Sequence, residues 1–144
     1  MRAAPFRAHL WSVVGLTGVH WRVVALRAGV SPALVRHLLF GRDGRSVKRI
    51  SHGSALRLSG LDHEDIMELH HRLVSAGPTV RRYERLRKQG HTASELAVVY
   101  QVDRAALESL PHATKCSALT ELVVLAAVLD DPGIAEEVPA WAVR

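Results

Sequence analysis

Residues 18–38 read GVHWRVVALRAGVSPALVRHL, and this stretch decides the predicted fold. Apolar residues recur at helical spacing on both sides of Gly29, which can turn the chain sharply because glycine accepts positive φ. Ser31 can cap the second helix, and Pro32 suits its first turn. Ala25 is small enough to let two helices cross closely. The stretch therefore predicts two helices joined by a tight turn.

The same pattern occurs again 72 residues later, where residues 90–110 read GHTASELAVVYQVDRAALESL. Six apolar positions of the first copy fall on apolar positions of the second: Val24 on Leu96, Ala25 on Ala97, Val30 on Val102, Ala33 on Ala105, Val35 on Leu107 and Leu38 on Leu110. Thr92 and Glu95 form a capping box, which marks the start of a helix. Gln101 stands where the first copy has its turn glycine, so we expect a distorted or longer turn there. The helix before each copy also aligns, which predicts two related three-helix units.

We predict an all-α fold in which two tri-helical helix-turn-helix units are joined by a helical connector. The first unit covers residues 1–61, a connecting helix residues 62–77, the second unit residues 78–132, and a tail residues 133–144. No stretch alternates apolar and polar residues for long enough to predict a strand. Residues 41–50 are predicted to form a basic loop, with a short β-hairpin as the alternative. A first helix is predicted from Pro5 to about residues 15–18, and Ser51 is predicted to cap a short helix through Leu58.

Charge is distributed unevenly along the 144 residues, whose net charge is +5. Residues 1–60 carry ten lysines and arginines against one acidic residue, a net charge of +9. Such a cluster around a helix pair indicates a polyanionic partner. A single cysteine, Cys116, excludes an internal disulfide and fits a reducing compartment. The longest apolar run, residues 122–129, is too short to span a membrane, so we predict a cytoplasmic protein without a membrane partner.

No metal, cofactor or catalytic site is predicted. Most of the nine histidines are scattered, and the adjacent pair His70 and His71 points to different helix faces, which suits no single metal. His63 followed by Glu64 lacks the second histidine of a zinc-binding H-E-x-x-H motif. The nucleophile elbow, the phosphate-binding loop and the dinucleotide fingerprint are also missing. We therefore predict that the chain is not an enzyme.

Two long segments resemble one family. Residues 6–61 resemble the Cro/repressor-like helix-turn-helix proteins common in actinobacteria and their phages. The motifs that carry this resemblance are F-R-A-H-L, the stretch of residues 18–38 quoted above, and K-R-I-S. Residues 80–131, with R-R-Y-E-R-L and E-L-A-V-V-Y-Q-V-D, resemble the second unit of tandem versions of these proteins. The resemblance implies a transcriptional regulator, such as a repressor, that binds double-stranded DNA on the nucleoid. The alternative is a protein-interaction adaptor or a recombination accessory factor built from the same units.

The second helix of the first pattern would enter the major groove, and it defines the predicted site. Arg36 is the best candidate for a bidentate contact to guanine O6 and N7. The predicted base contacts are Ser31, Pro32, Ala33, Arg36 and His37, and the predicted phosphate contacts are Arg42, Arg45, Lys48 and Arg49. In the second unit the candidates are Arg81, Arg82, Arg104 and Ser109. Asp103 and Glu108 share that surface, so packing or dimerisation is an equal alternative there.

Large apolar residues are predicted to pack in the core, and some of them also in a dimer interface. Trp11 and Trp21 can stack on bases, but their helical positions favour core-facing or half-buried packing. The apolar residues of the last predicted helix cover more than one face, which predicts burial with partial contact in a homodimer. These residues are Leu119, Leu122, Val123, Leu125, Ala126 and Leu129.

Overall fold

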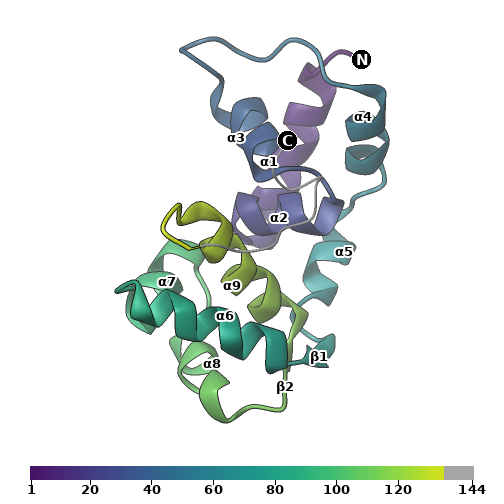
Figure 1. Cartoon of the computed structure of the whole chain (residues 1–144). Coiled ribbons are helices and arrows are strands. Elements are labelled where there is room, and N and C mark those ends of the chain that lie inside the picture. Colours follow the sequence, from purple (N-terminus) through teal and green to yellow (C-terminus); the bar gives the residue numbers. More distant parts are fainter. Residues whose placement is uncertain (135–144) are drawn as a thin grey trace. The chain divides into compact units, whose positions relative to one another are not determined.

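The computed structural model describes residues 1–134, and most of them are helical. The chain divides into two compact units, Met1–Met67 and a second that begins at Glu68. Figure 1 shows the elements of each unit, coloured along the sequence. The tail predicted over residues 133–144, with its isolated Trp141, lies outside the described residues from residue 135 onward.

Helices build the first unit, and α1 to α4 agree closely with the predicted segments. The helices are α1 (Ala4–Thr17), α2 (Trp21–Ala28), α3 (Pro32–Phe40), α4 (His52–Ser59) and α5 (His63–Glu68). The hydroxyl of Ser31 accepts a hydrogen bond from the Leu34 backbone N–H at 3.1 Å, and this bond starts α3. Ser51 caps α4 in the same way, at 3.2 Å from the Ser54 backbone nitrogen. These caps explain why the helix starts were predictable from the sequence.

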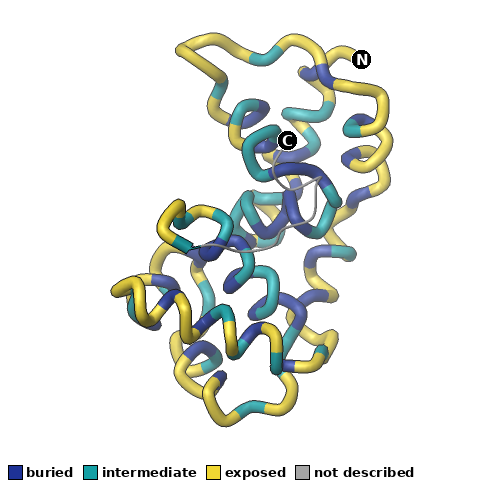
Figure 2. Tube along the Cα trace, viewed as in Figure 1, coloured by how far each residue is buried: buried dark blue, intermediate teal, exposed yellow. Residues whose placement is uncertain are grey.

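The turn between α2 and α3 has the predicted form. Gly29 adopts a left-handed conformation, with φ of 79°. The Val30 backbone N–H then donates to the Ala25 carbonyl at 3.1 Å, and both side chains are buried. Figure 2 shows the buried parts of these helices in dark blue. The core includes Leu10, Val13, Val23, Val24, Val35, Leu38, Ala55, Leu58 and Ile66.

The second unit combines helices with a two-stranded sheet. Its elements are β1 (Leu73–Ser75), α6 (Gly77–Lys88), α7 (Ala93–Tyr100), α8 (Arg104–Glu108), the 3₁₀-helix η1 (Leu110–His112), β2 (Lys115–Ser117) and α9 (Ala118–Asp130). The strands are antiparallel, with Val74 opposite Cys116. α9 packs against α6 and both strands. The core includes Tyr83, Leu86, Leu96, Tyr100, Leu107, Leu110, Val123 and Val124.

The connecting helix predicted over residues 62–77 is wrong in its extent. α5 ends at Glu68, and Gly77, which was expected to end the connector, begins α6 instead. The carbonyl groups of Leu69 and Arg72 accept hydrogen bonds from the first two backbone N–H groups of α9, at 2.9 and 2.7 Å. Because these carbonyls are paired with a distant segment, the helix cannot continue through them. The prediction that the chain contains no strand is wrong for the same reason, since β1 is stabilised by β2.

Gln101 does not distort the turn between α7 and α8. Its φ of 55° and ψ of 48° are left-handed, as are the 79° and 26° of Gly29. The Val102 backbone N–H donates to the Ala97 carbonyl at 3.1 Å, which repeats the bond of the first turn. The prediction of a distorted or longer turn is therefore wrong. A residue with a Cβ can take this conformation at a cost of about 1–2 kcal/mol.

We expect Gln101→Gly to raise the free energy of unfolding by up to about 1 kcal/mol. Glycine avoids the steric cost of the left-handed conformation but loses more backbone entropy on folding, so the gain is partial. The reverse exchange, Gly29→Gln, should lower the free energy of unfolding by a comparable amount. Urea unfolding followed by circular dichroism measures both. A Gln101→Gly protein less stable than wild type would show that contacts of the glutamine side chain outweigh its strain.

The two units repeat one order of elements. In each unit, a short extended segment is followed by three helical segments. A second extended segment, the returning segment, then pairs with the first, and a further helix follows. Arg2 is bridged to Arg49 in the first unit, as Val74 is paired with Cys116 in the second. The bounds of α2 and α7 differ by the 72 residues of the sequence repeat. The main difference is the connection before the returning segment, which is longer in the first unit and carries its basic residues.

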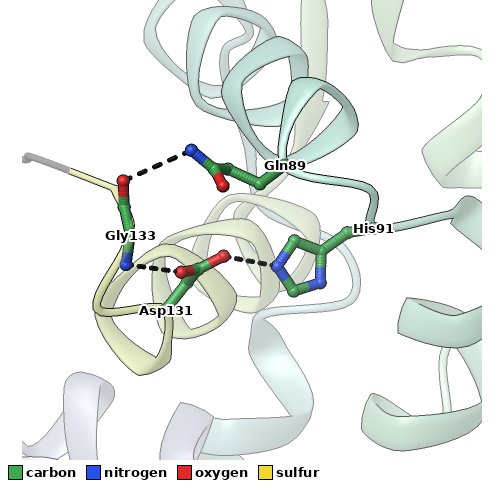
Figure 3. Close-up of polar contacts among 4 residues, drawn as sticks. All are labelled: Gln89, His91, Asp131 and Gly133. Atoms are coloured by element: carbon green, nitrogen blue, oxygen red, sulfur yellow. Dashed lines mark hydrogen bonds and ion pairs between the residues drawn. The ribbon is translucent and has the colours of Figure 1, made fainter.

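A polar contact closes the second unit after α9 (Figure 3). The Nε2 atom of His91 lies 2.6 Å from the Oδ2 atom of Asp131. The other carboxylate oxygen of Asp131 accepts a hydrogen bond from the Gly133 backbone N–H at 2.7 Å, and the Gln89 side-chain amide donates to the Gly133 carbonyl at 3.3 Å. The hydrogen bond from His91, aided by that from Gly133, holds the pKa of Asp131 below its ordinary value of 3.8.

This lowered pKa predicts a pH dependence of stability. The ionised carboxylate of Asp131 stabilises the fold above pH 3.8, and the contribution is lost as the pH falls through the lower folded pKa. Asp131→Asn should therefore unfold at a lower temperature than wild type at pH 7, and the difference should shrink as the pH approaches 2. Thermal unfolding followed by circular dichroism from pH 7 to pH 2 measures it, with Glu84→Gln as a control at an exposed carboxyl. An equal gap at all pH values would rule out the charged form of Asp131 as the cause.

Candidate nucleic-acid interface

The outward surface of α3 is only partly as predicted. Arg36 is exposed, while Pro32, Ala33 and His37 are half-buried. Ser31 is only 4% exposed, and its hydroxyl accepts the capping hydrogen bond of α3. The prediction that Ser31 faces outward is therefore wrong, because the geometry that caps the helix turns its side chain into the fold. Arg36 is the most accessible of the predicted base contacts.

An aromatic cluster covers the C-terminal end of α3. The ring of Phe40 lies edge-on to Trp11 and to Trp21, with centroids 5.6 and 5.9 Å away. The Arg22 guanidinium lies 4.7 Å from the centre of the Trp21 ring. Trp21 is half-buried, as predicted, but the prediction for Trp11 is wrong because its side chain is 46% exposed. These ring contacts join α1, the start of α2 and the end of α3.

The basic loop follows α3 directly, and the alternative β-hairpin is reduced to one isolated antiparallel bridge between Arg42 and Arg45, without extended strands. Asp43 and Gly44, with φ of 53° and 75°, form a tight turn between two arginines. The backbone N–H of Arg42 donates to the Arg45 carbonyl at 2.8 Å, and the reverse bond is 3.0 Å long. The four predicted phosphate contacts, Arg42, Arg45, Lys48 and Arg49, are all exposed.

Backbone contacts fix the loop to α3 and α1. Gly41 has φ of 82°, and a Cβ atom there would lie 2.7 Å from the Arg45 carbonyl oxygen. Only glycine fits this position without a shift of the loop. The guanidinium of Arg7 donates to the Leu38 carbonyl at 2.6 Å and also to the Val47 carbonyl. Arg7 therefore positions the loop against the end of α3 instead of presenting its charge outward.

The N-terminal segment holds the other end of the loop. The Ala3 backbone N–H donates to the Lys48 carbonyl at 2.9 Å, and the Ile50 N–H donates to the Met1 carbonyl at 3.0 Å. This pairing places Arg2 opposite Arg49 and adds an exposed cation to the loop. A hollow of about 430 Å³ lies at this junction, and it is lined by Arg2, Arg7, Lys48 and Arg49 among others. A hollow with this charge suits a phosphate group.

Sequence analysis missed the roles of Arg2 and Arg7. Arg2 precedes Arg49 by 47 residues and Arg7 precedes Val47 by 40, and no local pattern connects the two segments. The only signal was the general excess of basic residues in residues 1–60. Within the described residues, no ion pair involves the exposed cations of the interface, which leaves their charge available to a partner. These cations are Arg2, Arg36, Arg42, Arg45, Lys48 and Arg49.

The candidate residues of the second unit are arranged differently. Arg104 forms an ion pair with Glu108 at 3.2 Å. The Ser109 hydroxyl donates to the Ala106 carbonyl at 3.2 Å. Arg81 is exposed on α6. The next candidate, Arg82, is half-buried. α8, the counterpart of α3, therefore holds its one arginine in an ion pair, and the exposed basic side chains of this unit lie mainly on α6.

Within residues 1–134, no three His, Cys, Asp or Glu side chains gather where they could hold a metal ion. No helix in that range is long and apolar enough to cross a membrane. Comparison of the chain with protein-family models, curated proteins and solved structures yielded no match.

Proposed function

We propose that the first unit is a helix-turn-helix that binds double-stranded DNA sequence-specifically and that the protein regulates transcription on the nucleoid. The observation that carries the proposal is the exposed Arg36 on α3, followed directly by an anchored loop with four exposed basic side chains. α2 and α3 meet at the tight Gly29 turn, as the two helices of this motif do. The unit thus combines a rigid helix that can read bases with cations that can hold phosphates.

The length of α3 suits the major groove. An α-helix is about 10–12 Å across and fits the groove, which is about 12 Å wide, and the nine residues of α3 can place about 13.5 Å of helix along it. Arg36 lies in the middle of α3, where its guanidinium can donate to both O6 and N7 of guanine. Pro32 and Ala33, in the first turn, would lie near base edges, and His37 beside Arg36 would contact a base or a phosphate. In this arrangement Phe40 supports the helix through its ring contacts with Trp11 and Trp21.

The second unit has a different role in this proposal. α8 has only five residues, about 7.5 Å of helix, because Pro111 follows within one turn and the chain continues as a 3₁₀-helix. Its exposed surface carries Asp103, which repels phosphate, and its one arginine, Arg104, is paired with Glu108. We therefore assign the main contact with DNA to the first unit, and treat Arg81 and Arg82 as auxiliary backbone contacts.

The decisive experiment is selection of bound sequences from random DNA, followed by measurement of affinity against salt concentration. The proposal expects an enriched motif and an affinity that falls steeply with salt, by about 0.9 logarithmic units per phosphate contact for each decade of salt. A protein-interaction adaptor would enrich no motif and would bind DNA weakly. A recombination accessory factor would also bind DNA, but its enriched sites would lie at recombination sites instead of promoters.

We expect Arg36→Ala to cost about 1–3 kcal/mol of specific binding and to relax preference at one base pair. Arg36→Lys should keep the charge but lose the preference, because lysine lacks the planar fork that matches guanine. Arg57→Ala, at an exposed arginine of α4, is the matched control and should change affinity little. Fluorescence anisotropy with selected and random duplexes measures these effects. Equal losses on both duplexes would reassign Arg36 to a phosphate contact.

A further inference from the structure

The second unit contains a pocket of about 550 Å³ that the proposed DNA contact does not use. Its wall comes from three places: the last turns of α6, the start of α7, and the end of α8 with Pro111. Tyr83 and Ala93 form its apolar part, and both are almost completely buried. A pocket of this volume lies within the range of small-molecule sites.

The sequence repeat explains why the pocket is there. Ala93 corresponds to Trp21 of the first unit, at the same position before the same turn. In the first unit the Trp21 ring packs 5.9 Å from Phe40, whose counterpart is His112. The first unit therefore places aromatic rings between the start of its second helix and the end of its third. The second unit has a methyl group in place of the indole, and the space of a ring is left open.

Charge at the pocket favours a ligand with one negative group. Arg87 and Lys88 contribute two positive side chains, and Glu84 contributes a negative one. The fourth charged residue, Glu108, is already paired with Arg104 outside the pocket, at 3.2 Å. Counted together with Arg104, the five charged side chains at the pocket carry a net charge of +1.

We propose that this pocket binds a small planar aromatic carboxylate. The ring would lie against Tyr83 and Ala93, in the space that corresponds to the Trp21 indole, and the carboxylate would face Arg87 and Lys88. Binding of this ligand does not depend on whether the first unit binds DNA.

The test uses the full chain and three probes of one size class: indole-3-acetate, neutral indole and cationic tryptamine. Saturation-transfer NMR and calorimetry should detect saturable binding of indole-3-acetate, with a dissociation constant on the order of 1 mM for a ligand of this size. Indole should bind several-fold more weakly, and tryptamine weakest. Ala93→Trp should abolish binding, because it restores the ring of the first unit. Val98→Trp adds the same ring to α7 at a position that is 78% exposed and outside the pocket, and should bind as wild type does.

Two outcomes would overturn the proposal: no saturable binding of indole-3-acetate, or equal binding by a folded Ala93→Trp protein. Tighter binding of tryptamine would refute the assigned ligand charge. Circular dichroism establishes whether Ala93→Trp is folded. If it is not, the double variant Arg87→Glu, Lys88→Glu decides, because it should weaken indole-3-acetate at least tenfold while changing indole less than twofold. A double variant that weakens neither probe also overturns the proposal.

Discussion

Replacing Arg42, Arg45, Lys48 and Arg49 together with alanine should weaken binding to every DNA sequence and flatten its salt dependence. All four side chains are exposed on a loop held by Arg7 and the N-terminal segment. Loss of four phosphate contacts should reduce the slope of log affinity against log salt by about 3.6. Between 50 and 200 mM salt, that slope corresponds to about a hundredfold change in affinity. Anisotropy titrations at four salt concentrations on one specific and one random duplex measure both quantities.

A matched control separates the position of the charges from their number. Alanine at Arg81, Arg82, Arg87 and Lys88 removes four positive charges from the second unit and leaves the loop unchanged. We expect this control to reduce the slope by no more than about 1.8, the contribution of the two auxiliary contacts Arg81 and Arg82. Equal reductions by both variants would show that net charge, or a second DNA contact on α6, accounts for binding. An unchanged slope in the loop variant would exclude the loop from the interface.

Val123→Glu should unfold the second unit. Val123 lies in α9 with no exposed surface, and it belongs to the core that joins this helix to α6. A buried, unpaired carboxylate costs several kcal/mol, which is comparable with the whole stability of a small domain, about 5 kcal/mol or more. Loss of helical signal in circular dichroism at 25 °C measures the effect. Leu122→Glu, at the half-buried neighbouring position, is the control and should stay folded.

The Leu122→Glu variant also tests the predicted homodimer. In the last helix Leu119, Val123 and Ala126 are buried, whereas Leu122, Leu125 and Leu129 are half-buried. Burial of α9 in its own unit therefore accounts for half of the predicted residues. The partial dimer contact stays a prediction for the other half. Sedimentation of wild type beside Leu122→Glu decides it: a wild-type dimer that becomes monomeric supports the contact, and a monomeric wild type removes it.

The sequence by itself determined the helical elements and the turns around which they are built. Ser31, Ser51 and Thr92 predict helix starts because a cap depends on a hydrogen bond to a residue three positions ahead. Gly29 predicts a turn because the required φ is a property of that residue. The charge of the basic loop was equally visible, because it follows from composition. Interactions within a few residues can be read from the order of the residues alone.

Only the tertiary structure decided the features that join distant segments. The carbonyls of Leu69 and Arg72 end the predicted connector because they bond to α9, far along the chain. Arg7 is a positioning residue because its guanidinium reaches the carbonyls of Leu38 and Val47. The pocket beside Ala93 is formed where residues of α6, α7 and α8 come together with Pro111. Each of these three features depends on which segments pack together. The sequence alone did not reveal them, because the packing energy is shared among residues that no local pattern connects.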